Sequence, residues 1–316
     1  MNSLLEISEL SEAEAREHLE SIVWPNGVKC PHCGCNEKAY KMQGETQRDG
    51  LYKCANTECT KQFTFTVGTI MEGSHLSMKQ WLMAFHMMAL SKKGVSALQL
   101  QRQLGIGSYK TAWFLAHRIR VAMENKPASE IMKGTIEADE TYVGGKPRKG
   151  NNNATVIKRG RGTKKTPVLV LVSREGEAYA KPVERVNGET LKGAIRELVD
   201  KDARIITDDW AAYKGIGEEF EGGHHVVNHS AGEYARGDVH TNNAESYFAL
   251  LKRGVTDSFH HVSKKHLGKY CDEFSFRWTN RKIEDGERTA QVIKQIRGKK
   301  LVYKTSKHEE AQQESI

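Results

Sequence analysis

Residues 135–143, T-I-E-A-D-E-T-Y-V, decide the fold of the second half of the chain. β-Branched and aromatic residues are frequent in this run, which is typical of a strand. Asp139 stands in its middle, and an apolar strand seldom holds a central carboxylate without a use for it. Glu137 shares the face of Asp139, whereas Glu140 faces the opposite side, because side chains alternate along a strand. The run therefore predicts a strand that carries an acid at a functional site.

The residues after this strand continue in short β-rich runs separated by helical segments. The sequence predicts strands at residues 167–173, 177–182, 203–207 and 224–228, and helices at residues 189–199, 243–253 and 264–277. Strands and helices that alternate in this way indicate an α/β domain. Lys126-Pro127 marks the boundary before it.

Two further acids lie at the ends of predicted elements. Asp208 ends the strand in A-R-I-I-T-D-D-W, and Glu245 begins the helix in H-T-N-N-A-E-S-Y-F. Two hard cations about 3.5–4 Å apart need carboxylate oxygens that converge from separate elements, and these three acids together meet that need. Each acid alone is more often a solvated surface group, so the prediction depends on their joint placement. Lys252, seven residues after Glu245, shares its helix face and would hold a phosphate beside the metals.

The first part of the chain contains five of its six cysteines. Cys30 and Cys33 form the knuckle C-P-H-C, and Cys54 and Cys59 form a second pair about twenty residues later. Two such turns can converge on one tetrahedral zinc ion, and metal binding would then supply much of the folding free energy of so small a module. Cys35 is the spare thiol, because a ligand two residues from Cys33 would distort the knuckle. Free thiols in a loop are the alternative.

Residues 96–120 show a sequence pattern that is typical of a helix-turn-helix. A first helix ends at Gly105, a short turn follows, and the next helix mixes apolar and cationic residues. The second helix would enter the major groove of DNA by its N-terminal end. An ordinary helical hairpin is the alternative. The candidate DNA contacts are Ser108, Tyr109 and Lys110 for base edges, and Arg118 and Arg120 for phosphates.

The formal net charge is +8 over 316 residues, a balance that favours a polyanionic partner. Segment 144–166 holds eight Lys or Arg residues and no Asp or Glu, which predicts a flexible basic loop. Lys158, Arg159 and Arg161 are its candidate phosphate contacts, and a solvated insertion is the alternative. No apolar run of roughly 18 residues and no secretory signal are present, so we expect a cytoplasmic protein with reduced thiols.

Taken together, these motifs resemble the bacterial insertion-sequence DDE transposases with an N-terminal zinc ribbon, insertion-sequence family fifteen-ninety-five. The resemblance covers about residues 15–285. It rests on C-P-H-C with the second cysteine pair, Q-F-T-F-T-V-G-T-I-M-E-G-S-H-L-S-M-K-Q-W, I-E-A-D-E-T-Y-V-G-G-K, T-D-D-W-A-A-Y, and V-H-T-N-N-A-E-S followed by L-K-R. It implies an α/β, RNase H-like catalytic core preceded by a zinc ribbon and a helix-turn-helix, with Asp139, Asp208 and Glu245 as the acidic triad.

The resemblance also implies roles for the neighbours of the triad. Lys252 falls where the family places a lysine after its third acid, and the triad would hold two Mg²⁺ ions, with Mn²⁺ as a possible substitute. His240 and Asn242 would orient DNA or the carboxylates. The family varies at the third ligand, so Asn242 or Asn243 remains an alternative to Glu245.

The sequence predicts four parts. They are residues 1–70, an N-terminal helix and zinc ribbon; residues 71–128, a helix-turn-helix DNA-binding domain; residues 129–285, an RNase H-like DDE transposase domain with basic loop 144–166; and residues 286–316, a C-terminal tail.

The function implied by the resemblance is metal-dependent cleavage of DNA at insertion-sequence ends and strand transfer into target DNA. The partners would be the terminal inverted repeats and the target, bound by a homodimer or a larger assembly in the cytoplasm, at the nucleoid. Two alternatives stay open: a zinc-ribbon and helix-turn-helix regulator with an inactive RNase H-like domain, and a nuclease that cleaves without joining. A regulator has no need for an acid inside a strand.

Overall fold

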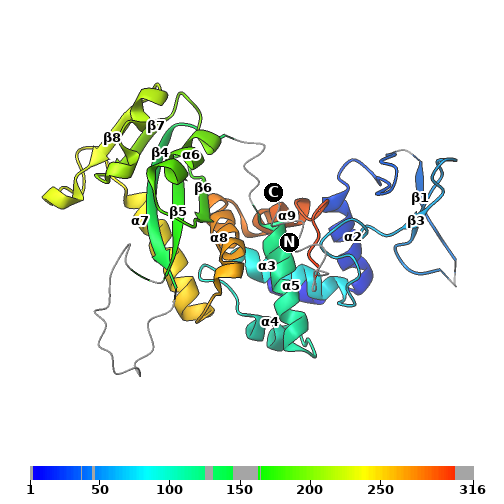
Figure 1. Ribbon diagram of the computed structural model, residues 1–316. Helices are drawn as coiled ribbons and strands as arrows, with labels where there is room; N and C mark the ends of the chain where they lie inside the picture. Colours follow the sequence, from blue (N-terminus) through cyan, green and yellow to red (C-terminus); the bar gives the residue numbers. More distant parts are fainter. Residues whose placement is uncertain are drawn as a thin grey trace. The chain divides into compact units, whose positions relative to one another are not determined.

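The computed structural model describes residues 3–36, 38–44, 47–124, 131–144, 163 and 165–302. The chain forms two compact units, whose elements are labelled in Figure 1. The first unit comprises Met1–Ser91, Val95–Met123 and Ile283–Ile316, and the second comprises Lys92–Gly94 and Glu124–Lys282.

The described part of the first unit contains six α-helices. They are α1 (Leu4–Glu9), α2 (Glu12–Val23), α3 (Met78–Leu90), α4 (Ala97–Gln103), α5 (Tyr109–Ala122) and α9 (Asp285–Lys294). The N-terminal segment, expected as one helix, is two helices because Ser11 caps α2 in a reciprocal capping box with Glu14. Ser77 caps α3 in the same way with Gln80. The helices expected before and after Gly105 are confirmed as α4 and α5.

Helix α9 corrects the expectation that residues 286–316 are a tail. Its apolar side chains Val292 and Ile293 are fully buried, and Thr289 Oγ1 lies 3.1 Å from Nδ1 of the buried His86 on α3. A short helix with only two buried apolar residues gives little periodic signal in a polar stretch of sequence. Residues 303–316 lie outside the described residues.

A small sheet follows the first two helices. It is antiparallel, in the order β1 (Ala39–Lys41), β2 (Tyr52–Cys54) and β3 (Gln62–Phe63). Trp24 packs edge-on against Tyr52, with ring centroids 5.3 Å apart, and Tyr52 stacks on Phe63 at 5.9 Å. These few aromatic rings are the apolar core of the module, which is small for a fold without a further cross-link.

The second unit is built on a five-stranded sheet. The strands are β4 (Thr135–Val143), β5 (Thr166–Ser173), β6 (Ala178–Pro182), β7 (Arg204–Asp208) and β8 (His224–Val227), in the order β6-β5-β4-β7-β8. The first three form an antiparallel meander, and β7 and β8 continue it parallel to β4. All five predicted strands are confirmed, and the topology is that of an RNase H-like core.

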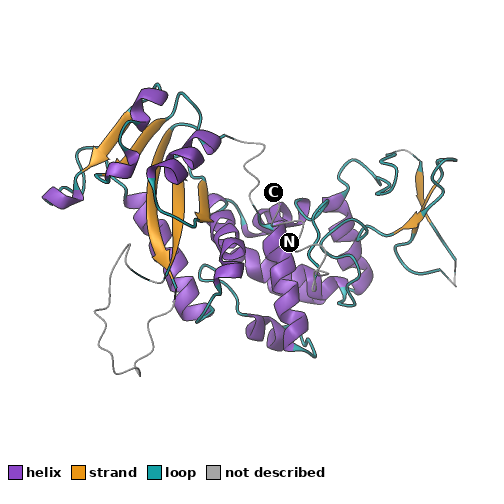
Figure 2. Ribbon diagram, in the orientation of Figure 1, coloured by secondary structure: helices purple, strands orange, loops and turns teal. Residues whose placement is uncertain are grey.

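Helices cover both faces of this sheet, as Figure 2 shows. β5 reads P-V-L-V-L-V and is buried on both sides, which explains its nearly continuous apolar sequence. Its three central valines pack under α7 (Asn242–Arg253) and α8 (Lys264–Thr279). Leu169 and Leu171 pack on the other face, under α6 (Gly188–Leu198). The acid-bearing strand β4 therefore lies in the middle of a three-layer core.

Candidate active site and cysteine cluster

The register of β4 and β7 places two of the predicted acids on the same face of the sheet. The strands are parallel, with Glu137 opposite Ile206. This is the last pair of the two strands, and Asp139 and Asp208 each follow it by two residues. Both side chains point to the face of Glu137, because two residues complete one period of a strand. Glu137 contacts the start of α7, so this face is the one that α7 covers.

Glu245 lies in the first turn of α7 and has an exposed side chain. Electrostatics link it to Asp139. Burial raises the pKa of Asp139 to about 8, and the negative charges of Glu140, Asp208 and Glu245 add to the rise. The predicted acids therefore lie within electrostatic reach of Asp139, and a cation among them would offset their repulsion.

Each strand acid accepts a hydrogen bond from a backbone N–H group that follows it closely in the chain. Asp139 Oδ1 accepts a hydrogen bond from the backbone N–H of Glu140 at 2.6 Å, and Asp208 Oδ1 accepts one from Trp210 N–H at 3.2 Å. Glu140 itself faces away, as predicted, and its Oε2 accepts a hydrogen bond from the buried Tyr213 hydroxyl at 3.1 Å. The alternation of the strand thus separates Glu140 from the acid site.

Lys252 lies on α7 within electrostatic reach of Asp139. Burial lowers the pKa of Lys252 and the neighbouring Lys165 lowers it further, whereas Asp139 raises it. Its Nζ lies 5.7 Å from the centre of the Phe248 ring. The helix therefore presents a cation on the side of the strand acids, where a phosphate oxygen would bind.

His240, Asn242 and Asn243 lie at the entrance to α7. His240 Nδ1 is 3.4 Å from Glu137 Oε1 and accepts a hydrogen bond from the backbone N–H of Asn242 at 3.4 Å. The side-chain amide of Asn243 donates to Glu137 Oε1 at 2.8 Å. The hydrogen bond to Glu137 uses Nδ2 of Asn243, whereas an amide binds a metal through Oδ1, so Asn242 and Asn243 stay alternatives to Glu245 as the third ligand. The sequence did not predict that Glu137 would form hydrogen bonds with the start of α7.

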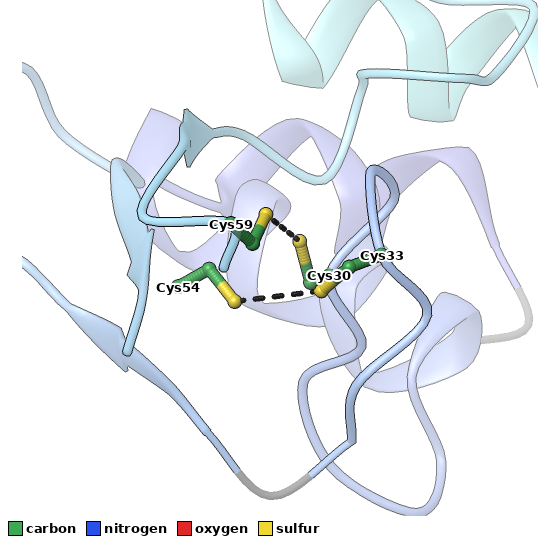
Figure 3. Close-up of side chains that lie close together, drawn as sticks. All are labelled: Cys30, Cys33, Cys54 and Cys59. Atoms are coloured by element: carbon green, nitrogen blue, oxygen red, sulfur yellow. Dashed lines mark hydrogen bonds between the residues drawn. The ribbon is translucent and has the colours of Figure 1, made fainter. Parts of the chain in front are cut away.

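The four predicted cysteines converge at one point of the first unit, as Figure 3 shows. The sulfur atoms of Cys30, Cys33, Cys54 and Cys59 all lie within 4.8 Å of one another, with Cys30 to Cys59 at 3.8 Å and Cys33 to Cys54 at 3.6 Å. A tetrahedral zinc ion with Zn–S bonds of about 2.3 Å requires sulfurs about 3.8 Å apart. The cluster therefore fits a structural zinc ion.

Cys35 stands outside this cluster, as predicted. Its Sγ accepts a hydrogen bond from Asn56 Nδ2 at 3.4 Å. Its backbone amide is the largest cause that lowers the pKa of Cys33, and hydrogen bonds with the other three clustered cysteines lower that pKa further. Among the residues that the structure describes, no second group of three or more Cys, His, Asp or Glu ligand atoms gathers as closely as the four sulfurs. The ligand atoms of the three predicted acids are therefore farther apart than the four cysteine sulfurs.

The candidate DNA contacts on α5 differ in their exposure. Ser108, Tyr109 and Lys110 are exposed at its N-terminus, and Ser108 makes no capping hydrogen bond there. The prediction that Arg120 contacts a phosphate is wrong, because Arg120 is only 1% exposed and cannot reach DNA. Arg118 is partly buried, lies over the Phe114 ring and donates to the carbonyl of Glu72 at 2.8 Å.

The predicted contacts Lys158, Arg159 and Arg161 of the basic loop lie outside the described residues. In the part of the chain that the structure describes, no helix has both the length and the apolar character needed to cross a membrane.

Comparison with known families agrees with this arrangement. Residues 131–279 match the ISXO2-like transposase domain, and residues 10–62 match the transposase zinc-ribbon domain. The first match spans the sheet with its acids, and the second spans the cysteine cluster. The fold and the two matches define the class as a zinc-ribbon transposase. Within this class, the chain belongs to insertion-sequence family fifteen-ninety-five.

One curated relative is similar over most of its length. It is described as an uncharacterized protein in transposable element ISH50 of Halobacterium salinarum and is 29% identical over 277 residues, which cover 85% of this chain and 91% of the relative. Two solved structures show weaker likeness, each over 63% of this chain and 70% of theirs. They are a pre-cleavage Mos1 transpososome (TM-score 0.27, 15% identity) and a Mos1 transposase paired-end complex with left transposon end (TM-score 0.28, 14% identity).

Proposed function

We propose that this transposase cleaves DNA at the ends of its insertion sequence and joins the freed ends to target DNA. The single observation that supports this chemistry is the β4–β7 register, which puts Asp139 and Asp208 two residues past the last strand pair, on the face covered by α7. Glu245 in the first turn of α7 completes the acid set. Carboxylates from three elements are the donor set that Mg²⁺ prefers.

The acid site would hold two Mg²⁺ ions, which activate the attacking water or 3′-hydroxyl and stabilise the leaving oxygen when bound. Asp139 and Asp208 supply oxygens from the sheet, and Glu245 supplies them from α7. Lys252, on the same helix, would bind a phosphate oxygen of the DNA strand and neutralise charge there. His240 and Asn242 would orient the strand or the carboxylates from the entrance to α7.

The remainder of the chain would deliver DNA to this site. Zinc held by Cys30, Cys33, Cys54 and Cys59 would fold the ribbon. The second helix of the helix-turn-helix, α5, would read base edges with Ser108, Tyr109 and Lys110, and the basic loop would contact phosphates with Lys158, Arg159 and Arg161.

The domain limits that we propose are 1–70 for the ribbon, 71–128 for the helix-turn-helix and 129–285 for the catalytic domain. Helix α9 packs in the first unit and so belongs with the helical domain. Two or more protomers would assemble on DNA, because two ends must be cut and joined together. The protein would act at the nucleoid in the cytoplasm.

The test is incubation of the purified protein with its own element ends, a target plasmid and Mg²⁺. We expect nicked ends and joined products on a gel, both dependent on the metal. Binding without any cleavage would support a DNA-binding regulator instead, and cleavage without joined products would support a nuclease.

A further inference from the structure

Glu137 is a fully buried acid that connects β4 to the start of α7. Its Oε2 accepts hydrogen bonds from the backbone N–H groups of Asn243 at 2.8 Å and Ala244 at 3.1 Å, and its Oε1 accepts one from Asn243 Nδ2 at 2.8 Å. Its side chain has no exposed surface. These hydrogen bonds join the carboxylate of Glu137 to the start of α7.

These hydrogen bonds replace the cap that α7 lacks. The first backbone N–H groups of a helix have no partner within the helix. Thr241 occupies the N-cap position of α7 but makes no side-chain capping hydrogen bond. Glu137, more than a hundred residues earlier, satisfies two of the N–H groups instead and places a negative charge at the positive end of the helix dipole. The cap of α7 is therefore a tertiary contact.

Arg174 balances the charge of Glu137 and holds the approach to α7. Its Nε lies 3.2 Å from Glu137 Oε1, and its Nη2 donates to the carbonyls of Asp238 at 2.5 Å and His240 at 3.4 Å. The same pair of residues thus fixes the segment before the helix and the first turn of the helix itself. This leaves the start of α7 little freedom to shift along β4.

The positions of these contacts connect them to the acid site. Glu137 lies two residues before Asp139 on β4, and Asn243 lies two residues before Glu245 on α7. We propose that Glu137 is a positioning residue, which sets the separation of Asp139 and Glu245 and thereby the affinity of the site for divalent cations. The inference rests on the proposed function, since it takes both acids as metal ligands.

Two substitutions at Glu137 test the inference, so that the result does not depend on the folding of one variant. Glu137→Gln keeps the size of the side chain and removes the charge and one acceptor oxygen. Glu137→Asp keeps the charge for Arg174 but shortens the side chain, so it loses reach toward α7. Glu273→Gln is the matched control, because Glu273 is also a fully buried acid, paired with Arg277 on α8 of the same unit.

Three measurements on the full-length protein separate positioning from stability: the melting temperature, amide hydrogen exchange at residues 243 and 244, and Mn²⁺ binding without DNA. The Mn²⁺ signal is corrected for the binding that survives in Asp139→Asn. We expect both Glu137 variants to lose amide protection and to bind Mn²⁺ tenfold or more weakly, the usual cost of losing a residue that orients a metal ligand. Glu273→Gln should lower the melting temperature and leave Mn²⁺ binding unchanged.

Wild-type Mn²⁺ affinity in both Glu137 variants would overturn the inference, and so would equal weakening in Glu273→Gln. Failure of the proposed function would appear differently. In that case, the wild-type protein would bind no more Mn²⁺ than Asp139→Asn, whatever the amide exchange showed at α7.

Discussion

Asp139 on β4 and Asp208 on β7 lie on the same face of the sheet, each two residues beyond Glu137 and Ile206, the last pair of the two parallel strands. The negative charge of Asp208 adds to the rise in the pKa of Asp139, so the two carboxyl groups lie within electrostatic reach of each other. Two acidic side chains this close destabilise the folded protein when no cation is bound. Acids placed in the central strands of a sheet at this cost indicate a functional site.

The metal-free protein should therefore be more stable without one of these charges. Burial and repulsion raise the pKa of Asp139 to about 8, so the metal-free protein must take up a proton there in order to fold at neutral pH. Asp139→Asn keeps the shape of the side chain and removes this cost. We expect the melting temperature in a chelator at neutral pH to rise by a few degrees. Added Mg²⁺ should raise the melting temperature of the wild-type protein and not that of the variant. A variant that melts below the wild-type protein in chelator would contradict the repulsion.

The ribbon should contain about one zinc ion per chain. Cys54→Ser should lower the zinc content and unfold the ribbon, because four sulfurs close one tetrahedron and the aromatic core beside them is small. Cys35→Ser is the control, since Cys35 lies outside the cluster. Elemental analysis of freshly purified protein measures the zinc. Protein that contains no zinc, or equal loss in the Cys35 variant, would contradict the assignment.

Packing of α9 on α3 should be sensitive to acid. Burial lowers the pKa of His86, so the folded protein holds this imidazole neutral. The unfolded chain takes up a proton near the usual pKa of about 6.5, and stability should therefore be lost as the pH falls below that value. His86→Gln should flatten the change in melting temperature between about pH 7.5 and pH 5.5. An unchanged slope in this variant would show that His86 does not titrate on unfolding.

The basic loop should determine the affinity for DNA of any sequence, and the N-terminus of α5 should determine the preference for element ends. Joint neutralisation of Lys158, Arg159 and Arg161 should weaken binding to every sequence and flatten its dependence on salt, because fewer counterions are released from the phosphates. Lys110→Ala should instead reduce the preference for element ends over random DNA. Fluorescence titrations at several salt concentrations measure both effects. A loop variant with altered sequence preference and an unchanged salt slope would reverse this division.

The residue pattern predicted the elements that carry the acids, since strand and helix periods are local properties of the sequence. The bounds of β4 are those that its β-branched run predicts, and the convergence of the cysteines follows from the paired knuckles. Glu137 escaped prediction because its partners lie more than a hundred residues away, and only the fold brings a strand acid to a helix N-terminus. Arg120 was misread because a cationic residue in a mixed helix gives no local sign of burial.

Cleavage by the triad variants tests the central claim most directly. Asp139→Asn, Asp208→Asn and Glu245→Gln are compared with Asp209→Asn, a neighbouring acid outside the triad, on supercoiled donor plasmid with Mg²⁺, beside a binding assay. We predict that each triad variant loses cleavage and joining while it binds element ends normally, and that Asp209→Asn remains largely active, because each triad change removes a charge that holds a hard cation. Full cleavage by Asp139→Asn would contradict the account.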